Sequence, residues 1–384
     1  MTKQCVLIDA YSWNDYHEVI NVGYLLMLMQ IYHDITYVAD TGACDSIQSQ
    51  LQAFGKSTDN IHFVRKSFSK PSNGIRKFLR LFRVSWDNYW HYMHTPSDAD
   101  VFYNNNLHLG TLLIHYFSFG KRNRVFSMCH AEMEMIDKRE ATTMSRTAGC
   151  WMYRTAFCST TLNRKMHFIM LSSDMADLFQ SYIRKENRSQ IHWIDHCYIR
   201  PQLTTSERAD NSEKVRLGLP GAITHQRGLP ELKKLLLSLP DETLELYAIS
   251  YISEHVSHPS LTLLNDTGRL SSYQEYGNYI SQMDAILLLY RKDSYRMTAS
   301  GAALEAIWQG KPIISIRNGY VDYLFRRFGP LGYVYDDIEQ LSQQLLHISR
   351  KDLSLFNDNL AKARESLLPT NVCQQLKKIV NETE

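Results

Sequence analysis

The chain has 384 residues, of which 44% are hydrophobic and 21% are charged. This length suffices for two or three domains, and the composition is ordinary for a globular protein. A formal net charge of +2 argues against bulk nucleic-acid binding. The seven cysteines are scattered and contain no Cys-x-x-Cys pair, so the sequence predicts neither a disulfide framework nor a structural zinc site.

Apolar strands alternate with helices from the start of the chain. Strands are predicted at 5–9, 35–38, 101–103, 124–129 and 168–171, and helices at 23–31, 107–117 and 174–183. This alternation favours α/β domains with parallel sheets. The polar segment 204–214 is the predicted linker, so we expect an N-terminal domain over 1–203 and a C-terminal domain over 214–384 that ends in helices.

The first residues lead directly into a strand, without the basic and apolar regions of a signal peptide. No stretch approaches the roughly 20 apolar residues of a membrane-spanning helix. We therefore expect a cytoplasmic protein, either free or peripheral at the inner face of a membrane.

A basic segment stands apart in the first half. Seven cations and no acids lie between Asp59 and Asp87: Arg65, Lys66, Lys70, Arg76, Lys77, Arg80 and Arg83. An apolar helical face is predicted from the spacing of Ile75, Phe78, Leu79 and Phe82. Residues 65–83 are interpreted either as a peripheral contact with an anionic membrane or as a helix that packs on its own domain with solvated cations.

Two polar residues follow the predicted strand that ends at Cys129. His130 has an ordinary pKa suited to accepting a proton near neutrality, and Glu132 would either orient His130 or act as the base itself. The alternative is structural: His130 satisfies a loop carbonyl and Glu132 is solvated.

The most informative segment lies at 300–314. Ser300 and Gly301 form a small-residue entrance to a helix that carries Glu305, and the preceding strand, 284–290, leads into a loop with Arg291, Lys292 and Arg296. A helix N-terminus favours a bound anion, and ligands of open α/β sheets bind beyond the carboxyl ends of strands. The segment predicts a nucleotide-diphosphate site, with an ordinary αβ unit as the alternative.

This pattern resembles the donor domain of glycosyltransferases with the GT-B architecture, in which two Rossmann-like domains face each other across a cleft. Residues 215–345 follow that domain in order. The segment 215–223 is similar to its first strand and diphosphate turn, 224–228 to the residues before its first helix, and 268–271 to its nucleobase loop, with Ser271 as the expected helix cap.

One position departs from the resemblance. Many retaining members carry two glutamates in this region, and Glu305 matches the second of them. The first would fall eight positions earlier, where this chain has Met297. The resemblance therefore assigns neither retaining nor inverting chemistry.

The resemblance implies transfer of a sugar from a nucleotide diphosphate sugar to a hydroxyl of a glycan or lipid-linked glycan, in surface polysaccharide synthesis. It implies donor contacts by Gly221, Arg227, Arg291, Arg296, Ser300, Gly301, Ala302 and Glu305, catalysis by His130 and Glu132, and a loop with His17, Asn21 and Gly23 before the first helix.

We expect no metal and no cofactor besides the donor. The Asp98-Ala99-Asp100 sequence precedes a strand and is interpreted as a solvated turn. A nucleotide-sugar epimerase of the same architecture and a non-catalytic binding protein remain the alternatives.

Overall fold

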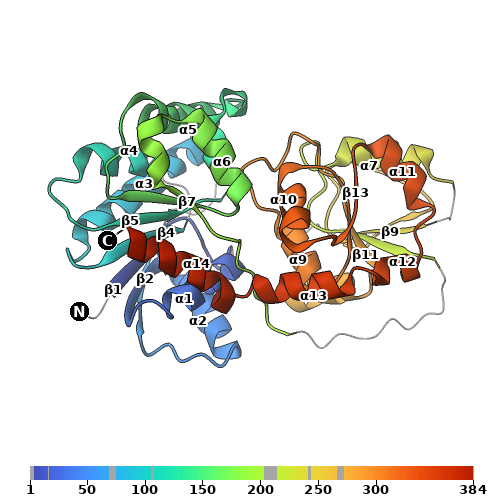
Figure 1. Ribbon diagram of the computed structural model, residues 1–384, viewed down its shortest axis with the longest axis horizontal. Coiled ribbons are helices and arrows are strands. Elements are labelled where there is room, and N and C mark those ends of the chain that lie inside the picture. The colour runs from blue at the N-terminus through green and yellow to red at the C-terminus, as the bar shows by residue number, and fades with distance from the viewer. Residues whose placement is uncertain are drawn as a thin grey trace. The chain divides into compact units, whose positions relative to one another are not determined.

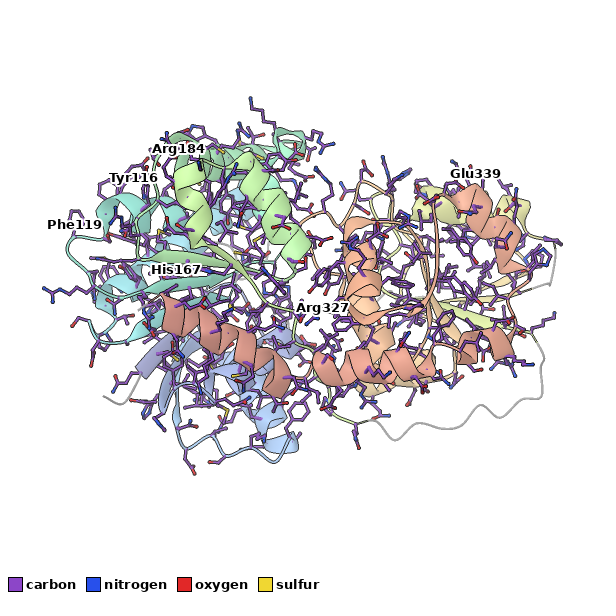
Figure 2. All side chains as sticks on the ribbon, viewed as in Figure 1. Tyr116, Phe119, His167, Arg184, Arg327 and Glu339 are labelled. Atoms are coloured by element: carbon purple, nitrogen blue, oxygen red, sulfur yellow. The ribbon has the colours of Figure 1, made fainter. Side chains whose placement is uncertain are left out.

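The computed structural model describes residues 4–15, 17–68, 75–104, 108–130, 132–202, 214–240, 244–265 and 272–383. Contacts divide the chain into two compact units (Figure 1). Unit 1 comprises Met1–Pro201, Met297–Ala299 and Leu367–Glu384, and unit 2 comprises Gln202–Arg296 and Ser300–Ser366. In each unit, side chains fill the space between the helices and the sheet (Figure 2).

Unit 1 is built on a parallel sheet. Within the described residues its strands are β1 (Gln4–Asp9), β2 (Asp34–Asp40), β3 (Ile61–Lys66), β4 (Asp100–Asn104), β5 (Val125–Met128), β6 (Met166–Met170) and β7 (Ile191–Trp193). They lie in the order β3-β2-β1-β4-β5-β6-β7, which is the Rossmann order with one added strand. Buried apolar side chains such as Leu7, Val101 and Phe126 fill the sheet, as expected where helices cover both faces.

The helices of unit 1 are α1 (Glu18–Leu28), α2 (Thr41–Ala53), α3 (Ile75–His94), α4 (His108–Phe117), α5 (Met144–Arg154), α6 (Ser173–Tyr182) and α14 (Pro369–Glu382). Helix α1 packs against α2 and α14, while α3, α4 and α5 pack on one another. Right-handed crossovers in this strand order place α1 and α2 on one face of the sheet and α3 to α5 on the other.

The last helix corrects the predicted domain limits, because α14 belongs to unit 1 rather than to the second domain. The Tyr198 amide donates to Leu367 O at 2.8 Å, and Gln375 Nε2 donates to Asp195 Oδ2 at 2.6 Å. Arg124 reaches Val380 O at 2.6 Å. Such contacts join residues far apart in sequence, so a local pattern does not reveal them. The predicted linker lies largely in residues 203–213, outside the described residues.

Unit 2 repeats the arrangement. Its described strands are β8 (Arg216–Leu219), β9 (Glu245–Ala248), β10 (Leu261–Leu263), β11 (Ala285–Leu288), β12 (Ile313–Ile316) and β13 (Gly332–Tyr335), all parallel, in the order β10-β9-β8-β11-β12-β13. The strand order reverses between β8 and β11, so this unit has the Rossmann order with its switch point at those two strands.

The helices of unit 2 are α7 (Leu229–Ser238), α8 (Tyr273–Ser281), α9 (Gly301–Trp308), α10 (Gly319–Phe328), α11 (Ile338–Leu345), α12 (Arg350–Ser354) and α13 (Asn357–Ser366). Helix α8 is capped by Ser272, whose side chain accepts the Glu275 amide, and not by the predicted Ser271. The expected nucleobase loop, 268–271, lies outside the described residues. The fold prediction of two Rossmann-like α/β domains is confirmed.

The structure also bears on two other predictions, the solvated turn at Asp98-Ala99-Asp100 and the lack of a membrane-spanning helix. Asp100 is not in a solvated turn: it lies buried in β4, ion-paired with Arg124 at 2.6 Å and bonded to the Tyr32 hydroxyl at 2.7 Å. Among the described helices, none combines the length and apolar character that crossing a membrane requires.

Candidate functional site

The carboxyl ends of β8 and β11 form a glycine-bounded pocket in unit 2. It is lined by Leu219, Pro220, Ala222, Ile223, Arg227, Gly228 and residues 287–290. Gly228 has φ +84°, and a Cβ there would collide with the Leu289 carbonyl oxygen. This glycine lets the start of α7 pass close to the end of β11, a role that sequence reasoning had not assigned to it.

Arg227 lines the same pocket, and Gly221 lies in the chain between Pro220 and Ala222, which line it. Gly221 has φ +75° in an exposed turn, with open space where a Cβ would stand. Arg227 is exposed, and its amide is held by Thr224 O at 2.8 Å. The structure thus places both predicted donor residues at the switch point of the sheet, where ligands of such folds bind.

The start of α9 has the predicted form. Ser300 caps the helix, its hydroxyl accepting the Ala303 amide at 3.2 Å. A Cβ on Gly301 would meet no atom within 4 Å, so the backbone is open at this point. Ala302 follows and is half-buried. The first amides of a helix have no partner within it, and together with the helix dipole they favour an anion.

Glu305 is buried in the same helix with 2% of its surface exposed. Its Oε1 accepts hydrogen bonds from the Tyr273 hydroxyl and from Gln309 Nε2, both at 3.0 Å. Tyr273, at the start of α8, was not anticipated from the sequence. The carboxylate is therefore held in one orientation, and its role as a ribose ligand stays a prediction.

The loop after β11 separates the two other predicted cations. Arg291 is exposed and pairs with Asp293, its Nε lying 3.3 Å from Oδ1. Arg296 is half-buried and lies beside the start of α10. A Cβ added to Gly319, the first residue of that helix, would be 3.7 Å from the Cα of Arg296. The loop thus packs against a second helix N-terminus, which Asn318 caps by accepting the Val321 amide.

In unit 1, three histidines gather beyond the ends of β1 and β5. The His130 ring lies 5.9 Å from the His17 ring and 6.0 Å from the His196 ring, centre to centre. His130 Nε2 is 2.9 Å from Asn104 Oδ1 and 3.4 Å from the Tyr24 hydroxyl. If Nε2 donates to the Asn104 oxygen, Nδ1 is the nitrogen that can accept a proton.

Burial keeps these imidazoles neutral. It lowers the pKa of His130 well below its ordinary value, and the neighbouring His17 and His196 lower it further. Burial also lowers the pKa of His17 and of His196 to about 4. Desolvation disfavours the charged form of each ring, so the neutral form of His130, which has a nitrogen able to accept a proton, is favoured around neutrality.

Glu132 contacts the backbone of His130 rather than its ring. Its Oε2 accepts the His130 amide at 3.1 Å, and the side chain is buried. The alternative in which Glu132 is solvated is therefore wrong. The His130 ring instead contacts the side-chain amide oxygen of Asn104. No signal in the sequence indicated this residue.

The predicted loop before the first helix is shorter than expected. Helix α1 begins at Glu18, just after His17, which has φ +62°. Asn21 lies inside the helix and donates to buried Asp9 Oδ2 at 2.6 Å. Gly23 faces Cys197, whose Sγ would lie 2.8 Å from an added Cβ. Asn21 and Gly23 therefore serve packing, and only His17 joins the histidine group.

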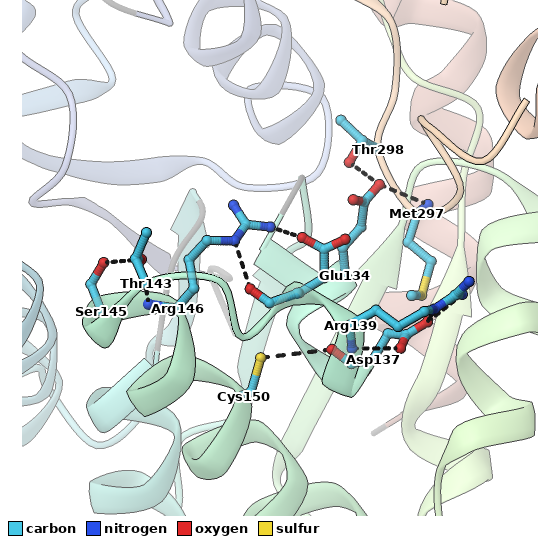
Figure 3. Close-up of polar contacts among 10 residues, drawn as sticks. Glu134, Asp137, Arg139, Thr143, Ser145, Arg146, Cys150, Met297 and Thr298 are labelled. Atoms are coloured by element: carbon cyan, nitrogen blue, oxygen red, sulfur yellow. Dashed lines mark hydrogen bonds and ion pairs between the residues drawn. The ribbon is translucent and has the colours of Figure 1, made fainter. Parts of the chain in front are cut away.

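Glu134 reaches the segment that contains Met297 (Figure 3). Its Oε1 accepts the Thr298 hydroxyl at 2.5 Å and the Met297 amide at 3.2 Å. These residues belong to unit 1, and Met297 is buried. A carboxylate from elsewhere in the chain thus lies against the backbone where the resemblance would place a glutamate side chain. No sequence signal links positions 163 residues apart.

Within the described part of the chain, no cluster of three or more His, Cys, Asp or Glu residues is arranged to hold a metal ion.

Comparisons with known proteins identify the fold. No protein-family description and no curated protein matches the sequence. The structure is similar to sucrose-phosphate synthase from Thermosynechococcus elongatus (TM-score 0.66, 13% identity, covering 99% of this chain and 98% of that one). It is also similar to Anabaena HepE in complex with UDP and glucose (TM-score 0.63, 11% identity, 99% and 100% covered).

The N-terminal domain of Candida albicans trehalose-6-phosphate phosphatase matches as well (TM-score 0.61, 12% identity, 100% and 96% covered). The match to HepE and that to the synthase both extend over almost the whole of each chain. The chain therefore has the GT-B fold.

Proposed function

We propose that the protein is a glycosyltransferase that moves a sugar from a nucleotide diphosphate sugar to a hydroxyl of a glycan or lipid-linked glycan. The observation that carries the proposal is the start of α9, where Gly301 leaves the backbone open at the helix N-terminus. Similarity to HepE, which was solved with UDP and glucose, supports a nucleotide-sugar donor.

The donor diphosphate would be bound by the amides at Gly301 and Ala302 and by Arg227 beside the switch-point pocket. Glu305 would accept hydrogen bonds from the ribose. Transfer breaks the bond between the sugar and the diphosphate, so negative charge grows on the leaving group. Fixed dipoles and cations stabilise such charge without reorganising, and this stabilisation often contributes more to catalysis than any other effect.

The acceptor would be bound by unit 1, with His130 as the base for its hydroxyl. The proton would move to Nδ1 as the hydroxyl oxygen bonds to the sugar carbon. Asn104 Oδ1 lies 2.9 Å from Nε2, and a hydrogen bond donated by Nε2 to this oxygen would leave Nδ1 as the nitrogen that accepts the proton. Surface polysaccharide synthesis is the process to which we assign the reaction.

A glycine substitution gives the sharpest test of the donor site. Gly301→Val adds a side chain into open space, so the thermal midpoint of the free protein should hardly change. The new methyl groups should block the diphosphate. A thermal-shift screen against UDP, GDP, ADP, CMP and dTDP first identifies the nucleotide.

Isothermal titration then compares the diphosphate with its nucleoside. We expect the variant to lose diphosphate affinity by at least tenfold, about 1.4 kcal/mol, and to keep nucleoside affinity. Equal affinity of both proteins for the diphosphate would reject α9 as the site. Donor turnover without any acceptor would instead favour the epimerase, and binding without turnover would favour a binding protein.

The proposal includes metal independence. If the helix and the cations neutralise the leaving group, transfer should proceed at an unchanged rate in excess EDTA. Loss of activity in EDTA and its recovery with Mg²⁺ or Mn²⁺ would contradict this part alone.

A further inference from the structure

An exposed apolar stripe runs along α3. It consists of Ile75, Leu79, Trp86 and Trp90, whose exposed fractions are 67%, 58%, 49% and 52%. Their spacings of four, seven and four residues place them on one face of the helix. Large exposed apolar surfaces are uncommon on monomeric proteins and mark interaction sites.

The opposite face of α3 is anchored to unit 1, so the stripe does not reflect poor packing. Val84 and Tyr92 are buried. Arg80 is also buried, donating to Tyr11 O at 2.9 Å and lying 4.6 Å over the Tyr11 ring. Arg80, predicted to lie off the apolar face with the other cations, is therefore not solvated but points inward, whereas Ile75 and Leu79 of the predicted apolar face are exposed.

The helices that pack against α3 also carry exposed apolar side chains. On α5, Met144 and Trp151 are 58% and 63% exposed, and at the end of α4 Phe117 and Phe119 are 48% and 75% exposed. Tyr116 and Phe119 lie at the outer edge of unit 1 in Figure 2. Between the three helices lies an apolar pocket lined by Leu81, Phe82, Ser85, Leu109, Ser145, Ala148, Gly149 and Met152.

The charged residues beside the stripe indicate an anionic partner. Arg76 and Arg83 are exposed on α3, and Asp87 is the one acidic residue from Ile75 to His94. Exposed tryptophans beside cations suit the boundary between lipid headgroups and acyl chains. We propose that the α3 stripe, with its flanking cations, docks unit 1 onto an anionic phospholipid bilayer.

The docking helix is connected to the histidine group. Arg80 holds Tyr11, whose ring lies 6.2 Å from the His17 ring, which in turn lies 5.9 Å from His130. These contacts connect the helix that carries the stripe to the proposed base. This last step rests on the proposed function; the docking itself does not.

Vesicle binding of the full chain tests the docking independently of catalysis. Co-sedimentation compares phosphatidylcholine vesicles with vesicles that also contain phosphatidylglycerol, at low and high salt. We expect binding to the anionic vesicles that weakens with salt, since screening reduces the attraction. Tryptophan emission should shift to the blue and be quenched by brominated lipids.

Paired variants locate the surface. Trp86→Ser with Trp90→Ser, and separately Arg76→Gln with Arg83→Gln, should each lower vesicle binding roughly tenfold. The matched controls are Leu237→Ser, on a residue 90% exposed in unit 2, and Lys377→Gln with Lys378→Gln on α14; both should bind as wild type. Circular dichroism confirms that each variant is folded.

Absence of vesicle binding, or equal loss in the stripe variants and the controls, would overturn the proposal. So would concentration-dependent dimerisation that the Trp86→Ser, Trp90→Ser variant abolishes, because the stripe would then be a contact between copies. Failure of nucleotide binding with intact vesicle binding would overturn only the glycosyltransferase proposal.

Discussion

The carboxylate of Glu134 accepts the hydroxyl of Thr298 at 2.5 Å, joining a short turn after β5 to the residues directly before α9. The same Oε1 accepts the Met297 amide. One carboxylate thus fixes both the backbone and a side chain of the segment that leads to Ser300. The contact gives the first prediction.

Thr298→Val keeps the size of the side chain and removes the hydroxyl. A hydrogen bond to a charged group contributes roughly 1.5–3 kcal/mol, so the free energy of unfolding should fall by about that amount. Urea denaturation measures it. In a double-mutant cycle with Glu134→Leu, which removes the acceptor, the two losses should be far from additive; additive losses would show that the contact is absent in solution.

The second prediction concerns two glycines with similar backbones. Gly221 and Gly228 have φ +75° and +84°, but an added Cβ meets nothing at Gly221 and the Leu289 carbonyl at Gly228. Gly221→Ala should lower the free energy of unfolding by roughly 1–2 kcal/mol, the cost of placing a side chain on a left-handed backbone. Gly228→Ala should cost roughly 1–3 kcal/mol more because the chain must also move. Equal unfolding free energies would contradict the close approach.

The third prediction asks whether Glu305 binds ligand or only supports the helix. Glu305→Gln should weaken nucleotide binding by roughly 1–3 kcal/mol, the range for a lost charged hydrogen bond. Tyr273→Phe is the matched control, since it removes one partner of Oε1 and leaves the carboxylate. Isothermal titration compares them. If both variants only lower stability and bind as wild type, Glu305 is structural.

The sequence was most informative where a local pattern decides the structure. Strand 284–290 contains β11, the helix predicted after the Ser300-Gly301 entrance is α9, and the alternation of elements led to the correct fold. Apolar runs and caps act over a few residues, so they can be recognised in a single sequence.

Predictions failed where distant residues decide. Asn21 looked like a loop residue, but buried Asp9 accepts its amide and the helix extends through it. Asp100 looked solvated because Arg124 and Tyr32 come from other elements. Glu134 and Asn104 gave no local signal, since their partners lie 163 and 26 positions away.

The fourth prediction is a pH dependence of stability. The unfolded His17 takes up a proton near its ordinary pKa of 6.5, whereas the folded His17 does so only at about 4. The unfolded chain therefore binds more protons between these values, and stability should fall as the pH is lowered from 6.5. The slope is about 1.4 kcal/mol per pH unit for each such histidine.

His17→Asn tests this contribution, because asparagine tolerates the left-handed backbone at this position. Urea midpoints at pH 7, 6 and 5 should show a shallower decline in the variant than in wild type. Parallel curves would mean that His17 titrates normally in the folded protein.

The last prediction concerns the base. His130→Ala should lower turnover by ~10²–10⁴, the usual contribution of a positioned general base, with donor affinity unchanged because unit 2 holds the proposed donor site. The sequence alone suggested a rate that rises with pH through about 6–7. Burial lowers the pKa of His130, so the structure moves this rise in rate to lower pH. The turnover of the wild-type enzyme should be nearly constant around neutrality and fall only as acid protonates the ring.

Asn104→Ala should lower turnover less than His130→Ala and shift the acid limb of the pH profile, since it removes a hydrogen-bond partner of the His130 ring. Glu132→Gln, which keeps an oxygen for the His130 amide, should have little effect. Full activity in the His130→Ala, Glu132→Gln double mutant would reject both as bases.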